Sequence, residues 1–190
     1  MKYFAITPDT CTPEHVTTQL LKLRDRHVSF LYLRSPLLYN DDVRTLVSAV
    51  HAAGIVPLIP YLVAEQYPDI RCGVHFKSGE HHVLMSRKPW SDLLITASSH
   101  ESAQARMLLE GPAHYVFISP VYQPLSKPGS RQALIPLQHL RELTACFGER
   151  VVLLGGMTPH RIQELRKELG DNFSVAGISM FFGTADENNT

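Results

Sequence analysis

Short apolar runs alternate with helix-like segments along the whole chain, and this alternation limits the possible folds more than any other feature. The apolar runs are mostly unbroken stretches of Val, Ile, Leu, Phe and Tyr, which is typical of parallel strands buried on both faces. Strand–helix repetition of this kind predicts an α/β fold. The eight candidate strands are 3–6, 30–34, 55–59, 73–76, 93–95, 115–118, 151–154 and 173–178.

Helix-start signals lie between several of these runs. Thr12-Pro13 and Thr158-Pro159 each combine a capping residue with proline at the first helical position. Asn40-Asp41-Asp42 precedes a segment with apolar residues at helical spacing that ends at Gly54. The candidate helices are 13–26, 43–53, 101–109, 136–147 and 159–169.

The number of strands distinguishes between two α/β architectures, an open doubly wound sheet and a closed barrel. Eight strands favour a single (β/α)₈ TIM barrel, and the chain lacks the GxGxxG and GxxxxGK[ST] motifs of nucleotide-binding sheets. We expect one barrel domain over residues 1–183 and a polar tail over 184–190, with a short or missing final helix. Such a gap would expose apolar barrel wall, so we expect a second subunit or another chain segment to cover it, for example in a homodimer.

The composition favours a globular protein that handles small molecules. The chain has 190 residues, 44% of them hydrophobic, with 18 Lys and Arg against 18 Asp and Glu. It has no basic tract for nucleic acid and no apolar run of about 20 residues for a membrane. The three cysteines lie far apart without CxxC spacing, which argues against a disulfide framework. We therefore expect a cytoplasmic protein.

In barrels of this class the chemistry lies at the carboxyl ends of the strands, and phosphate often binds after strands seven and eight. Gly155 and Gly156 follow the seventh candidate strand, and Gly177-Ile178-Ser179 ends the eighth. Glycines allow close approach of the backbone, and free N–H groups with a hydroxyl suit an anion. The sequence therefore predicts a phosphate site formed by Gly156, Ile178 and Ser179.

Other strand ends carry polar and cationic residues. Arg34 follows the second candidate strand, Ser98 and His100 follow the fifth, and Lys127 follows the sixth. Each has a structural alternative: a solvated surface cation for Arg34 and Lys127, and a cap or packing residue for His100.

Three further histidines come after or within the fourth candidate strand. We expect His75 to be a hydrogen-bonded core residue. His81 and His82 are expected in a solvated turn, where Glu80 beside them is a candidate metal ligand.

Five of these segments, "GVHF", "ITASSH", "SPVYQPLSK", "VVLLGGMTP" and "GISMFF", resemble in order and spacing the thiamine phosphate synthase family, which includes a thiazole tautomerase branch. The resemblance covers essentially the whole chain and implies a (β/α)₈ barrel. It also implies joining of a thiazole phosphate to a pyrimidine diphosphate, with Mg²⁺ on the leaving diphosphate.

The resemblance assigns roles to individual residues. Lys127 matches the loop lysine that closes over the anionic substrates, and Arg34 matches the arginine of the strand-two motif. Gly156, Ile178 and Ser179 match the thiazole-phosphate site. Ser98 and His100 match the Ser-x-His after strand five, so Lys127, Arg34 and His100 are the candidate catalytic residues and Ser98 a candidate substrate-binding residue.

The chain departs from the family pattern where the diphosphate and Mg²⁺ bind. Tyr32 and Pro36 replace a glutamine and a lysine, and Tyr61 stands where a magnesium-binding aspartate belongs. Glu80 falls close to the second magnesium ligand. Since a hard cation needs several oxygen ligands, the sequence predicts weak Mg²⁺ binding and little synthase turnover.

Three functions remain open at this stage. The first is a thiamine phosphate synthase-like transferase, and the second is a metal-free tautomerase or isomerase acting on a phosphorylated heterocycle. The histidine of the tautomerase branch is replaced by Pro120, which leaves His100 as a candidate base. The third is a non-catalytic barrel that binds a phosphorylated ligand.

Overall fold

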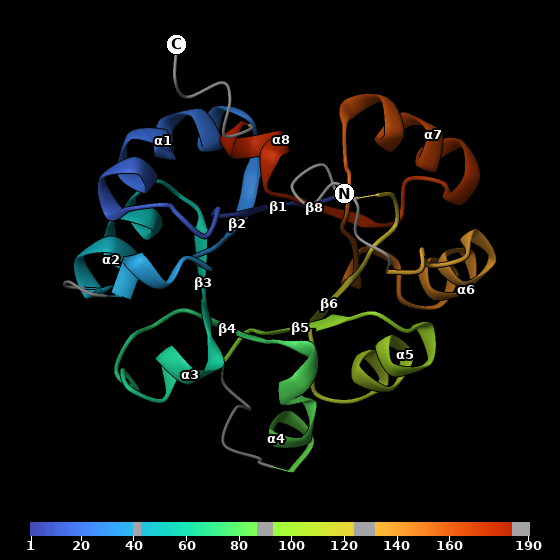
Figure 1. The fold of residues 1–190 in the computed structure, drawn as a ribbon, viewed down its shortest axis with the longest axis horizontal. Coiled ribbons are helices and arrows are strands. Elements are labelled where there is room, and N and C mark those ends of the chain that lie inside the picture. The colour runs from blue at the N-terminus through green and yellow to red at the C-terminus, as the bar shows by residue number, and fades with distance from the viewer. Residues whose placement is uncertain (40–42, 87–92, 124–131, 184–190) are drawn as a thin grey trace.

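The computed structural model describes residues 1–39, 43–86, 93–123 and 132–183. Eight parallel strands in it form a closed barrel, each paired with its neighbours in chain order, and β8 pairs with β1 (Figure 1). The predicted (β/α)₈ barrel is therefore confirmed. The strands are β1 (Tyr3–Ile6), β2 (Val28–Tyr32), β3 (Val56–Pro60), β4 (Gly73–Phe76), β5 (Ile95–Ser99), β6 (Tyr115–Ile118), β7 (Val151–Leu153) and β8 (Ser174–Gly177).

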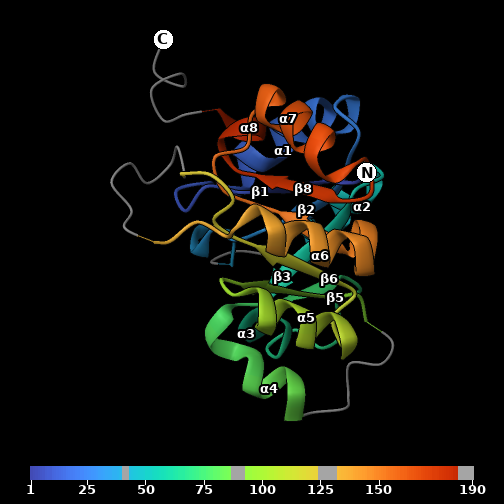
Figure 2. The ribbon, with the colours of Figure 1, turned by 90° about the vertical axis from the view of Figure 1, so that its right-hand side faces the viewer.

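Helices surround the barrel, and the short α8 lies between the long α1 and α7 (Figures 1 and 2). The long helices follow the predicted ranges within one or two residues, and Thr12 and Thr158 accept from the N–H groups of His15 and Arg161 as expected of caps. The predicted cap at 40–42 lies outside the described residues. The helices are α1 (Pro13–Asp25), α2 (Val43–Ala52), α3 (Tyr61–Ala64), α4 (His81–Ser86), α5 (Ser102–Glu110), α6 (Leu137–Phe147), α7 (Pro159–Leu169) and α8 (Ser179–Phe182).

Strand β5 departs most from the sequence prediction. It begins at Ile95 and runs to Ser99, whereas the prediction ended it at Ile95. The segment Thr96–Ser99 is polar, so it does not resemble a buried strand. It is a strand because parallel partners on both sides, β4 and β6, bond to it.

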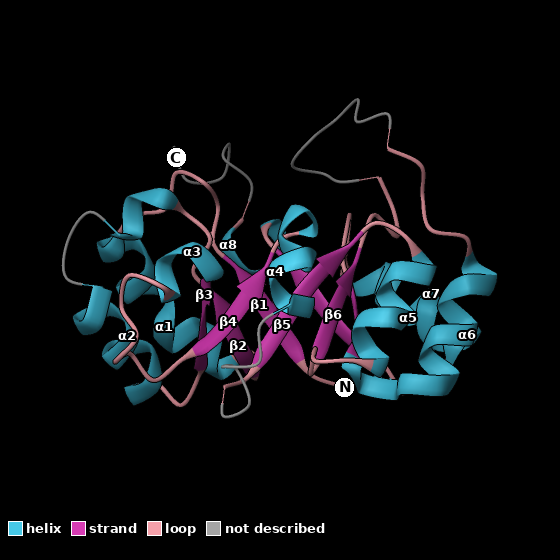
Figure 3. Ribbon diagram, turned by 90° about the horizontal axis from the view of Figure 1, so that it is seen from below, coloured by secondary structure: helices cyan, strands magenta, loops and turns pink. Residues whose placement is uncertain are grey.

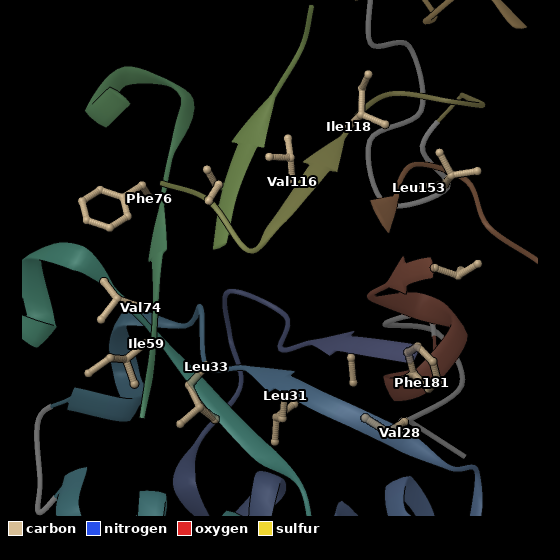
Figure 4. Packing of buried hydrophobic residues seen from close by; sticks show 14 of the residues in the cluster. Val28, Leu31, Leu33, Ile59, Val74, Phe76, Val116, Ile118, Leu153 and Phe181 are labelled. Atoms are coloured by element: carbon tan, nitrogen blue, oxygen red, sulfur yellow. The ribbon is translucent and has the colours of Figure 1, made fainter. Parts of the chain in front are cut away.

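Two apolar layers hold the barrel together. The inner layer fills the barrel with large side chains, of which Phe4, Phe30 and Phe117 stack or meet edge to face. The outer layer lies between the strands and the helices, and Figure 4 shows Leu31, Leu33 and other members of it. Burial on both faces explains why the strands read as continuous apolar runs.

The last helix is short, as the sequence predicted. α8 is a single turn that lies between α1 and α7 (Figures 1 and 2). Phe181 and Phe182 on it are buried, and Phe181 meets Tyr3 edge to face. A hollow of about 370 Å³ remains between α1 and α7, lined in part by Tyr3, Arg26 and Ile162.

Two smaller findings complete the fold. No helix among the described residues is long and apolar enough to cross a membrane. All three cysteines are free. Cys11 is buried, and Cys146 is exposed.

Candidate functional site

A cavity of about 570 Å³ opens at the carboxyl ends of the strands, the end toward which their arrowheads point in Figure 3. Six of the candidate residues line it. Arg34, Ser98 and His100 come from the first part of the chain, and Gly156, Ile178 and Ser179 come from the last part. Lys127 lies outside the described residues. Because parallel strands place their carboxyl ends together, residues 145 positions apart line one cavity (Arg34 and Ser179).

The glycines after β7 have left-handed backbone conformations, with φ of +107° at Gly155 and +58° at Gly156. They also lie against the loop that follows β6. A Cβ on Gly156 would stand 2.3 Å from the carbonyl oxygen of Gln123, and one on Gly155 would stand 3.0 Å from the Cα of Pro120. The sequence prediction concerned the close approach of a ligand, and the structure shows that these glycines also allow close packing of the chain's own loops.

Backbone hydrogen bonds join these same two loops. The N–H of Val121 donates to the carbonyl of Leu154, and that of Tyr122 donates to Gly155. Arg161, on the first turn of α7, donates to the carbonyl of Gly156 at 2.6 Å and stacks on the Tyr122 ring at 4.7 Å. This side of the cavity is therefore shaped mainly by backbone.

Arg34, two residues after β2, lies on another part of the cavity wall and is held by Asp9. Its guanidinium is 2.9 Å from the Asp9 carboxylate, and the Thr7 hydroxyl accepts from the backbone N–H groups of Arg34 and Ser35. Both Arg34 and Asp9 line the cavity. Asp9 was not singled out from the sequence, although its position just after the first strand was a usable signal.

Lys77 adds a second cation to the cavity wall. It directly follows β4, and its neighbour Ser78 also lines the cavity. Arg34, Lys77 and Asp9 are the ionised side chains among the described lining residues, so the cavity carries net positive charge. This charge suits an anionic ligand. The sequence reading missed Lys77, even though strand-end logic applied to it equally.

A buried polar chain runs across the middle of the barrel. His75 lies between the rings of Tyr32 and Phe117. Its Nδ1 is 2.8 Å from Thr96 Oγ1, and its Nε2 is 2.8 Å from Ser98 Oγ. Burial lowers the pKa of His75 to about 3, with Lys77 and His81 nearby adding to the effect. His75 is thus the neutral, hydrogen-bonded core histidine that the sequence predicted.

His81 is buried, which contradicts its prediction as part of a solvated turn. It begins α4, and its Nε2 lies 2.7 Å from the carbonyl oxygen of Ser98. Since a carbonyl only accepts, Nε2 carries the hydrogen. The neighbouring His82 is exposed, as predicted.

His100 is an exposed lining residue of the cavity, and one of its ring nitrogens makes a hydrogen bond. Its Nδ1 lies 2.8 Å from the carbonyl oxygen of Ser119, so Nδ1 donates. In the neutral ring Nε2 is then an acceptor. This geometry allows His100 to accept a proton from a ligand in the cavity.

The residues that would hold Mg²⁺ do not fit that ion. Glu80 Oε2 accepts from the backbone N–H of Lys77 at 2.7 Å, as in a capping box, and Glu80 does not line the cavity. Tyr61 is buried in the outer layer against Phe76, away from the inner layer. Among residues 1–39, 43–86, 93–123 and 132–183 there is no cluster of three His, Cys, Asp or Glu side chains suited to a metal.

The closed parallel barrel and the cationic cavity at its carboxyl end define a (β/α)₈ barrel with a site suited to phosphorylated ligands. The chain belongs to the thiamine monophosphate synthase family, which it matches over residues 3–181. The resemblance found in the sequence is therefore confirmed.

A named relative agrees with this assignment. The chain is 29% identical over 142 residues, 74% of its length, to a thiamine-phosphate synthase from Geobacillus thermodenitrificans. The match spans about half of that relative (54%).

Solved structures support the same fold. Thiamine phosphate pyrophosphorylase from Pyrococcus furiosus superposes with a TM-score of 0.69 at 19% identity, covering 97% of this chain and 89% of that one. A geranylgeranylglyceryl phosphate synthase from Thermoplasma acidophilum, solved with sn-glycerol-1-phosphate, gives 0.64 at 13% identity, covering 98% and 87%. At these identities the likeness concerns the fold alone.

Proposed function

We propose that this chain is a thiamine phosphate synthase-like enzyme of thiamine biosynthesis. It binds a thiazole phosphate and joins it to a pyrimidine diphosphate. The observation that carries the proposal is a single cavity whose wall combines a glycine-lined part shaped by backbone with two cations, Arg34 and Lys77. Family membership supports the reaction class.

The two sides of the cavity have separate roles in this proposal. Gly156, Ile178 and Ser179 receive the thiazole phosphate through backbone and hydroxyl donors. Arg34 and Lys77 bind the diphosphate, and Lys127 adds a third positive charge. The residues present do not suit Mg²⁺, so these side chains stabilise the charge that develops on the leaving diphosphate.

A second candidate function is a metal-free tautomerase or isomerase on a phosphorylated heterocycle, with His100 as the base. The observation that favours it is the position of Glu80, whose carboxylate accepts from Lys77 N–H instead of facing the cavity. A barrel that binds the phosphorylated ligand without turnover is the third. The second and third candidates use the same phosphate site as the synthase. They differ from it only in the reaction, or in having none.

The test is to mix both synthase substrates, with millimolar Mg²⁺ or with chelator, and to assay thiamine phosphate. Turnover that survives the chelator and is lost in Arg34→Gln supports the synthase proposal. Turnover abolished by the chelator and by Glu80→Gln would show that Glu80 holds a metal. It would contradict the proposal that side chains, and not Mg²⁺, stabilise the leaving diphosphate. No turnover, with thiazole phosphate still bound, would reject the synthase in favour of the other two.

A further inference from the structure

The buried hydrogen bonds that join Thr96, His75 and Ser98 can run in either of two directions, and the tautomer of His75 decides between them. Thr96 Oγ1 lies 3.3 Å from the carbonyl oxygen of Val74, in donor geometry. A hydroxyl has one hydrogen, and a carbonyl only accepts. We take the Thr96 hydrogen to point to Val74, so that Thr96 meets His75 as an acceptor; the 2.8 Å contact with Nδ1 does not by itself distinguish this direction from the reverse one.

The polarity of the imidazole follows. Since Thr96 Oγ1 accepts, His75 Nδ1 carries the ring hydrogen and donates over 2.8 Å. The ring is fully buried and neutral, so its Nε2 has a lone pair and no hydrogen. The Ser98 hydroxyl, 2.8 Å away, must then donate inward to Nε2.

Ser98 is the residue through which this series of hydrogen-bonded side chains reaches the cavity. Its side chain is half-buried and lines the cavity together with His75. His81 Nε2–H holds its carbonyl at 2.7 Å, so two histidines fix one residue. With its hydrogen directed to His75, the Ser98 oxygen offers only lone pairs to a ligand.

We propose that Thr96 and His75 are positioning residues that fix the Ser98 hydroxyl as a hydrogen-bond acceptor, so that the cavity selects a ligand with an N–H or O–H donor at this point. The inference rests on the proposed binding function of the cavity. The opposite tautomer would make Ser98 a donor and reverse the selection. Such a site rejects a ligand that lacks the matching group, because a buried polar atom is left without its partner.

The first measurement is the tautomer itself. Two-bond ¹H–¹⁵N spectra of the labelled protein, with His75 assigned through His75→Gln, should show a hydrogen on Nδ1 and none on Nε2 at neutral pH. In Thr96→Val the acceptor for Nδ1 is gone, so the hydrogen should move to Nε2. Thr96→Ser keeps the hydroxyl and should retain the native tautomer.

The spectra have a clear contrary result. A hydrogen on Nε2 in the unmodified protein would overturn the proposal, and so would an unchanged tautomer in Thr96→Val. The unmodified protein decides the first point even where a variant fails to fold.

The second measurement tests recognition with a pair of probes of equal shape. 4-Amino-2-methylpyrimidine has an N–H donor where 2,4-dimethylpyrimidine has a methyl group. The unmodified protein and Thr96→Ser should prefer the amine by about tenfold in affinity, and Thr96→Val should reduce the preference below about twofold. Equal affinities in the unmodified protein, or no binding of either probe, would overturn the recognition step. Failure of the synthase proposal would appear instead as absent thiamine phosphate, with the tautomer unaffected.

Discussion

The two sides of the barrel mouth are built in different ways. The side after β7 and β8 is made of backbone: two glycines with positive φ, interloop hydrogen bonds and the turn that begins α8. The side after β1, β2 and β4 is made of side chains, chiefly Asp9, Arg34 and Lys77. The departures from the family pattern that the sequence analysis inferred near the diphosphate and Mg²⁺, at Tyr32, Pro36 and Tyr61, lie on or after β2 and β3. A backbone site depends on few residue identities, whereas a side-chain site changes with each substitution.

The largest effect is expected on the backbone side. Gly156→Val should weaken binding of thiazole phosphate by about a hundredfold or more, because the new side chain meets Gln123 O and displaces the loop after β6. Isothermal titration measures the loss, with circular dichroism to check the fold. Gly170→Val is the matched control: its φ is +77°, but nothing lies within 4 Å of its Cβ. Equal losses in both variants would attribute the effect to backbone strain instead of to the site.

A smaller effect is expected on the side-chain side. Lys77→Gln should lower the affinity for inorganic pyrophosphate by about tenfold, because one charge-assisted contact is lost. The affinity for thiazole phosphate should change less. Lys22→Gln on the exposed face of α1 is the control. Equal losses for the two ligands would mean that the sides are not separate sites.

Acid should destabilise the protein through the buried histidine. The native pKa of His75 is about 3 against 6.5 for a free side chain, so the unfolded state binds more protons between these values. The free energy of unfolding should therefore fall as the pH drops from 6.5 toward 3, by up to about 1.4 kcal/mol per pH unit from this group. Urea unfolding at several pH values should show a shallower slope for His75→Gln. His160→Gln, at an exposed position on α7, should leave the slope unchanged.

Mg²⁺ should have the smallest effect. Millimolar Mg²⁺ should change the affinity for thiazole phosphate less than about twofold, because Glu80 is engaged with Lys77 N–H and Tyr61 lies in the outer layer. Calorimetric titration of thiazole phosphate with and without Mg²⁺ measures this effect, and titration with Mg²⁺ alone tests for a metal site. Saturable Mg²⁺ binding that disappears in Glu80→Gln would contradict this prediction. It would show that Glu80 is a metal ligand.

The sequence by itself determined the barrel. Unbroken apolar runs require burial on both faces, and capping residues such as Thr12 and Thr158 set the starts of helices locally. Strand ends then indicated Arg34, Ser98, His100, Gly156 and Ser179 as cavity residues, because in a parallel barrel all strands end at the same mouth.

Only the tertiary structure decided how these residues are used. Glu80 turns toward Lys77 N–H, His81 is buried beneath Ser98, and Gly156 makes room for Gln123, and each depends on a partner supplied by the folded chain. The strand β5 is another case, since polar Thr96 and Ser98 belong to a strand only because β4 and β6 flank them. Local residue patterns carry information about spacing and propensity. The direction of a side chain and of its hydrogen depends on contacts between distant segments, which no local pattern contains.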